Sequence, residues 1–117
     1  MTTPIDVNTL LAGLKTAITG VLQKDVTTIE GYSERQLQAM AQQAKWIAAA
    51  SLSGELSSDM RDFFLNTLKD SATNFANTLK GLAVITVEKV WNALVGALWT
   101  AIGNAINAAL PLPQAPA

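Results

Sequence analysis

The chain has 117 residues, of which 50% are apolar, 6% are aromatic and 15% are charged. Its eight basic and nine acidic residues leave a net charge of −1 with no basic cluster, so sequence-specific binding of nucleic acid is not expected. Cysteine and histidine are both absent, which excludes disulfides, thiolate sites and the commonest general base and metal ligand.

The first helix is predicted at residues 4–23. The segment Thr3–Asp6 supplies a hydroxyl cap, a proline in the first turn and an early carboxylate. Apolar residues then follow at helical spacing: Val7, Leu10, Leu11, Leu14, Ile18, Val21 and Leu22. Gly13 and Gly20 each weaken this helix by roughly 1 kcal/mol relative to alanine. The same two glycines would allow a neighbouring helix to approach closely.

The second helix is predicted at residues 33–52. Ser33 and Gln36 form the S-x-x-Q pattern of a capping box, and Gly54 suits the position just after the helix end. One narrow face carries the weakly apolar residues Leu37, Met40, Ala44, Ile47 and Ser51. Such a narrow stripe favours tight packing against one partner helix.

A long third helix is predicted over residues 58–110, about 80 Å at 1.5 Å per residue. Ser57–Asp59 caps its start, and no proline occurs before Pro111. An eleven-residue pattern, which Leu68, Leu79 and Val90 follow, runs along it. A bend near Gly81 is the alternative, because a β-branched run follows that glycine. The fold class is therefore all-α, with two short helices and one long helix that is either continuous or bent near Gly81.

Charge divides the chain into three parts. All charged residues lie within residues 1–89, which form a soluble-looking helical part. Residues 90–110 form a charge-free helix for assembly or membrane contact, and residues 111–117 are a proline-bearing tail that ends the helix. A helix with no charge on any face must be buried in protein, in copies of itself or in a membrane.

The charge-free helix has a four-residue rhythm that aligns residues in rows. Large apolar residues occupy one row, alanines the next, and small or polar residues a third. The predicted assembly interface takes residues from these rows together with two tryptophans: Ala93, Ala97, Ala101, Ala105, Leu94, Leu98, Ile102, Ile106, Asn92, Asn104, Trp91 and Trp99. In this interpretation, alanines pack helix against helix while the bulky row meets a second layer or lipid. A charge at Leu98 would then abolish assembly or membrane binding. A stable monomeric remainder after truncation at Lys89 would show that the tail exists for assembly.

Three kinds of burial are open for this helix, and assembly with copies of the chain or other assembly proteins is favoured. A membrane span is the second interpretation, since 21 residues just cross a hydrocarbon core of about 30 Å. Its asparagines and the central Trp99 argue against that span. A closed monomeric bundle ranks last, because two short, weakly apolar helices would have to cover three faces of the last helix.

No catalytic site, cofactor site or metal site is predicted. The carboxylates stand mainly at helix starts, as Asp59 and Asp62 do, where they stabilise the helix dipole. The serines lack a histidine partner, and no glycine-rich phosphate loop occurs. No secretory signal is visible at the start, so the protein is expected to be made in the cytoplasm. The function predicted from these features is non-enzymatic.

The stretch from Thr27 to Trp99 has a charged helical front (TTIEGYSERQLQAMAQQAKWIAAAS) and leads into an apolar helix (VEKVWNALVGALW), which a short proline-bearing end follows. In this organisation it resembles small helical proteins of tailed bacteriophages, over about two thirds of the chain. The resemblance implies a virion component that lines or plugs a portal or tail, or that is ejected to help DNA cross the cell envelope. Holins of the inner membrane share the style but generally have a cleaner span, which favours the virion class. A small soluble helical regulator is the remaining alternative.

Overall fold

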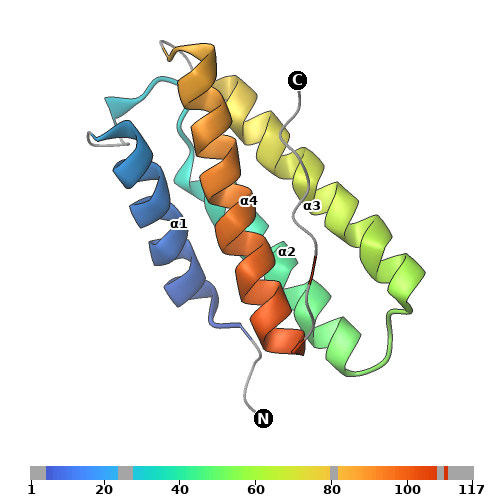
Figure 1. Cartoon of the computed structure of the whole chain (residues 1–117). Coiled ribbons are helices and arrows are strands. Elements are labelled where there is room, and N and C mark those ends of the chain that lie inside the picture. The colour runs from blue at the N-terminus through green and yellow to red at the C-terminus, as the bar shows by residue number, and fades with distance from the viewer. Residues whose placement is uncertain (1–4, 24–27, 80–81, 108–109, 111–117) are drawn as a thin grey trace.

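The computed structural model describes residues 5–23, 28–79, 82–107 and 110 (Figure 1). This part of the chain forms four helices and no strand: α1 (Val7–Leu22), α2 (Glu34–Leu52), α3 (Ser58–Thr78) and α4 (Val84–Ile106). The predicted all-α class is therefore confirmed.

Side-chain caps explain where three of the helices begin. Asp6 precedes α1, and its carboxylate accepts hydrogen bonds from two backbone N–H groups of the first turn, at 2.9 and 3.3 Å. The hydroxyl oxygens of Ser33 and Ser57 each accept a bond of 3.2 Å from an N–H group three residues further on, at the starts of α2 and α3. The first helix begins at Val7 and not at residue 4, because Asp6 is its cap and not part of its first turn.

The predicted continuous helix over residues 58–110 is wrong, because the chain leaves the helical conformation after Thr78. Leu79 is extended, with φ −72° and ψ 130°, and Ala83 is extended again, with φ −67° and ψ 152°. The alternative of a change of direction near Gly81 is closer, although Gly81 itself lies outside the described residues. The break lets α4 run back along the bundle, antiparallel to α3 (Figure 1).

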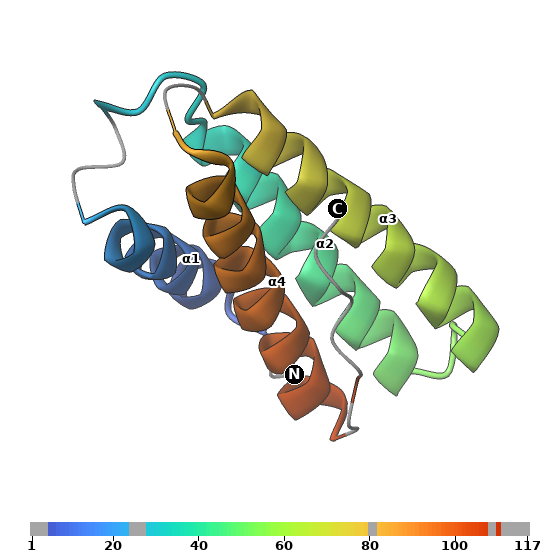
Figure 2. The same cartoon turned by 45° about the horizontal axis from the view of Figure 1, so that its top comes forward.

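The four helices form a bundle in which α4 is the shared partner. α4 contacts α1, α2 and α3, whereas α1 and α3 do not contact each other over the described residues. In Figure 1, α4 lies in front between α1 and α3, with α2 behind it; Figure 2 shows α2 and α3 side by side. The cross-section is thus a rhombus, with α2 and α4 at the near corners and α1 and α3 at the far ones.

The core of the bundle is built around the charge-free helix α4. Its buried apolar residues face side chains from all three other helices: Leu14 and Ile18 of α1, Leu37 and Ile47 of α2, Leu68 and Phe75 of α3. Trp91 is buried too, and its indole Nε1 donates a 2.9 Å hydrogen bond to the Thr73 hydroxyl of α3. The expectation that the chain has too few helices to cover the last one was wrong, because α3 is a separate helix and supplies the missing cover.

Among the described residues, none of the four helices combines the length and the apolar character that crossing a bilayer requires.

Candidate functional site

The large apolar side chains left exposed in the described residues belong to two neighbouring segments. They are Trp46 and Leu52, in the second half of α2, and Met60 and Phe63, in the first turns of α3; their exposed fractions are 49%, 56%, 48% and 62%. Single exposed apolar residues are common on protein surfaces, but a group of them marks a contact surface. This end of the α2–α3 pair is therefore the first candidate site.

Three aromatic rings form a continuous cluster there. The ring of the partly buried Phe64 meets Trp46 edge to face, with centroids 4.8 Å apart, and meets Phe63 in the same way at 5.4 Å. We call Trp46, Phe63 and Phe64 the aromatic cluster. Because the central ring also packs on the core, the two exposed rings are held in place before any partner arrives.

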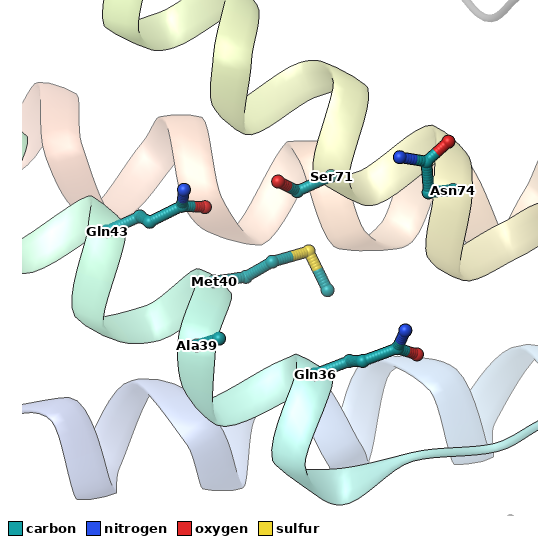
Figure 3. Close-up of a pocket in the computed structure, with 6 residues that line it drawn as sticks. All are labelled: Gln36, Ala39, Met40, Gln43, Ser71 and Asn74. Atoms are coloured by element: carbon teal, nitrogen blue, oxygen red, sulfur yellow. The ribbon is translucent and has the colours of Figure 1, made fainter.

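A pocket of about 250 Å³ lies along the seam between α2 and α3 (Figure 3). Gln43 is three residues from Trp46, and Ser71 is seven residues, about two turns, from Phe64, so each lies on the side of its helix that carries the aromatic residue. The pocket is lined by Gln36, Ala39, Met40, Gln43, Ser71 and Asn74. We call the aromatic cluster, Met60 and these lining residues the α2–α3 face. None of its side chains is charged, and its amides can donate and accept hydrogen bonds.

A second concavity lies along the seam between α1 and α4. This α1–α4 groove has a volume of about 410 Å³, and its lining includes Asp6, Thr9, Gly13, Ala101, Asn104 and Ala105. The floor is shallow because most of these side chains are small. A Cβ atom added at Gly13 would meet nothing within 4 Å, so the space above that residue is open. Asp6 is the ionisable residue in this lining, and its carboxylate already caps α1.

The structure divides the predicted assembly interface among three environments. The bulky residues Leu94, Leu98 and Ile102, with Trp91 and Trp99, are buried in the chain's own core. Asn92 and Asn104 are exposed, whereas Ala93, Ala97, Ala101, Ala105 and Ile106 are half-buried. Three of the predicted residues, Ala101, Asn104 and Ala105, come together in the α1–α4 groove. Their role in assembly stays a prediction.

Sequence reasoning did not select the aromatic cluster, although two signals for it are present. Trp46 does not belong to the apolar stripe of its helix, which runs through Leu37, Met40, Ala44 and Ile47. Phe63 and Phe64 are adjacent, and adjacent residues point about 100° apart on a helix, so both rings cannot face the same core. A large aromatic residue outside its helix's apolar stripe was the usable signal.

The charged groups of the described residues are spread over the surface. Lys15 of α1 and Glu34 of α2 form a salt bridge of 3.3 Å, in which both side chains are largely exposed. Asp59 and Asp62 are exposed in the first turns of α3. In the part of the chain that the structure describes, no three acidic side chains gather closely enough to hold a metal ion.

Comparison with known proteins found no matching family model, no similar curated protein and no similar solved structure. The two surfaces from which a function can be inferred are the α2–α3 face and the α1–α4 groove. The bacteriophage resemblance stays a prediction from the sequence.

Proposed function

We propose that the protein is a non-catalytic, self-assembling helical protein whose copies contact one another through the α2–α3 face. The observation that carries the proposal is the exposure of Trp46, Met60 and Phe63 beside a pocket lined by amides. Aromatic side chains held rigidly at a surface are the usual anchors of protein–protein contacts.

Covering the exposed rings of Trp46 and Phe63 would contribute a sizeable favourable free energy to a contact with a partner. Phe and Trp side chains bury about 150–250 Å² each when fully covered, so a half-exposed ring leaves about 100 Å² in water. At about 25 cal/mol per Å², covering one such ring contributes roughly 2.5 kcal/mol. Trp46 and Phe63 together therefore supply about 5 kcal/mol to any contact that covers them.

The low net charge of the chain is compatible with a second copy as the partner, and the small area of the face indicates that each contact is weak. The residues that define the α2–α3 face are uncharged, but the same stretch of α3 also carries the exposed carboxylates Asp62 and Asp70. With a net charge of −1 for the whole chain, the overall like-charge repulsion between copies is small. Residues 60–74 of α3 span about 21 Å, and two adjacent helices are about 20 Å wide, which gives a footprint of about 400 Å². A standard interface buries about 800 Å² on each partner. Each contact is thus expected to be weak, as suits an assembly held by many repeated contacts.

The bacteriophage resemblance extends this proposal to a place: an assembly of this kind would belong to a virion, as a portal-associated, tail-associated or ejected component. That extension is supported by sequence organisation alone. An interface made by the bulky row of α4, and equally a holin-like insertion of Val90–Leu110, would require the bundle to open, because Leu94, Leu98 and Ile102 are inside it. The α2–α3 face needs no such opening.

The test is to measure mass against concentration for the full chain and for the double variant Trp46→Ala/Phe63→Ala. In light scattering up to about 1 mM, the wild-type mass should rise above 12.4 kDa, and the double variant should stay close to that value. Leu52→Ala is the matched control: Leu52 is equally exposed, but at six residues from Trp46 it points about 120° away around α2, off the side that carries the aromatic cluster. This variant should assemble as the wild type does. Circular dichroism should show the same helix content in all three proteins. A wild type that stays monomeric throughout, or a double variant that assembles normally, would refute the proposal.

A further inference from the structure

We infer that the α2–α3 face of one copy docks into the α1–α4 groove of the next copy, so that the assembly grows head to tail. This inference rests on the proposed function and adds the identity of the receiving surface. The α2–α3 face and the α1–α4 groove share no helix. Because α2 contacts α4 while α1 and α3 stay apart over the described residues, these two surfaces lie on opposite sides of the bundle (Figures 1 and 2).

The two surfaces are complementary in shape. The α2–α3 face carries protruding rings, of which Trp46 and Phe63 are about half exposed. The α1–α4 groove offers about 410 Å³ over a lining of glycine, alanine and short polar side chains together with Ile5 and Leu10. A cavity of about 150 Å³ accommodates one benzene ring, so the groove has room for both exposed rings. Gly13 matters here because a side chain at its position would occupy that space.

The two surfaces are also compatible in polarity. No charged side chain of the α2–α3 face would have to leave water, and the carboxylate of Asp6 already accepts two backbone hydrogen bonds at the end of the groove. Thr9 and Asn104 border the groove and can pair with the amides of the opposing face, such as Gln43. Docking would cover the apolar rings while the Asp6 carboxylate keeps its two backbone hydrogen bonds.

Head-to-tail growth uses each copy twice, while every single contact keeps its footprint of about 400 Å² on each partner. A head-to-tail contact engages different surfaces on the two copies, so every internal copy has one neighbour on each side. With a footprint of about 400 Å² on each side, an internal copy buries about 800 Å² in total. A contact between opposite sides cannot close on a pair, so it produces an open chain or, where the rotation allows, a ring.

Two variants test the groove as the receiving surface: one places an arginine inside the groove, and the other places an arginine on the same helix outside it. Gly13→Arg puts bulk and charge into the groove, and Gly20→Arg is its matched control. Gly20 is on the same helix, has nothing within 4 Å of an added Cβ, and is not part of the groove lining. Sedimentation should show an association constant at least about tenfold lower for Gly13→Arg, with Gly20→Arg unchanged. Arginine replaces glycine in an exposed helix position in both, so both variants should melt at or above the wild-type temperature.

Mixing separates head-to-tail growth from face-to-face pairing. The Trp46→Ala/Phe63→Ala variant keeps its groove, and Gly13→Arg keeps its aromatic cluster. Neither should assemble alone, and an equal mixture should yield a pair of twice the 12.4 kDa chain mass that does not grow further. If Gly13→Arg assembles like the wild type while the double variant does not, the receiving surface is not the groove and this inference fails, although the proposed function survives. If the double variant assembles normally, the proposed function itself fails.

Discussion

Gly31 shows how a single residue fixes the top of this bundle. It has a φ of +90°, and an added Cβ would collide with the backbone carbonyl of Thr78, at the end of α3. The Thr78 hydroxyl also approaches the Gly31 carbonyl oxygen, at 3.4 Å. The loop before α2 therefore lies directly on the end of α3, and only glycine fits the contact.

Gly31→Ala should lower the free energy of unfolding by about 2–4 kcal/mol, because a positive φ and a backbone collision add together. Gly54→Ala is the natural control. Gly54 also has a positive φ, of 82°, but nothing lies within 4 Å of an added Cβ, so only the conformational part, about 1 kcal/mol, should be lost. Urea titration of both variants measures the difference, and equal losses would mean that the contact with α3 contributes nothing.

A second prediction at this scale concerns the hydrogen bond from Trp91 to Thr73. Thr73→Val keeps the shape of the side chain but leaves the buried indole N–H without its acceptor, which should lower the free energy of unfolding by about 1–3 kcal/mol. Thr67→Val serves as the control. Its hydroxyl is exposed and bonds only within its own helix, so the expected change is within about 0.5 kcal/mol. Denaturant midpoints that match for the two variants would contradict this assignment.

Residue by residue, the sequence predicts caps better than surfaces. Ser33, Ser57 and Gly54 all act where their types suggest, since capping is a local property of a few consecutive residues. The exposure of Trp46 and Phe63 could not be predicted with the same ease. The rule that apolar residues lie inside has many exceptions, and which aromatic residue is the exception depends on where neighbouring helices stop.

At the scale of elements, the limits of α2 follow closely from the sequence, whereas the division between α3 and α4 does not. Leu68, Leu79 and Val90 recur every eleven residues, so one continuous helix would keep them on the same side. The apolar pattern is therefore equally compatible with one helix and with two. Tertiary packing distinguishes the two cases, because α3 can contact α4 only if the chain turns back between these two helices.

α4 contacts each of the other three helices. Truncation after Lys89 is therefore not expected to leave the stable remainder that the assembly interpretation requires. Removing residues 90–117 deletes the shared partner of α1, α2 and α3, including Leu94 and Leu98, so the remainder should lose its cooperative unfolding transition. Truncation after Leu110 keeps every described residue and should retain that transition. Thermal unfolding by circular dichroism compares the two. A sharp transition for the shorter chain would show that α1–α3 fold without α4.

A charged substitution at Leu98 tests the stability of the fold and not an assembly interface. The side chain is fully buried, so the substitution removes core packing and buries a charge at the same time. Loss of assembly in that variant would report unfolding and would say nothing about an interface. Exposed positions such as Trp46 and Gly13 are the informative ones, since they leave the core intact.

For the whole molecule, the extents of 43 × 30 × 19 Å describe a flattened bundle in which the α2–α3 and α1–α4 seams lie on opposite sides. The sequence indicates that the last helix must be buried, and the chain satisfies that need from its own residues. What the sequence cannot reveal is which apolar residues remain after this internal burial. Those residues depend on the relative positions of all four helices, and they are the ones available to a partner.

The three tryptophans of this chain occupy two different environments, which gives the protein an intrinsic optical readout. Trp91 and Trp99 are enclosed by the bundle, whereas half of the Trp46 surface meets solvent. Emission from the first two follows the integrity of the fold, and emission from the third follows whatever covers the end of α2. Unfolding and docking would therefore move the spectrum in opposite directions, the first toward longer wavelength and the second toward shorter.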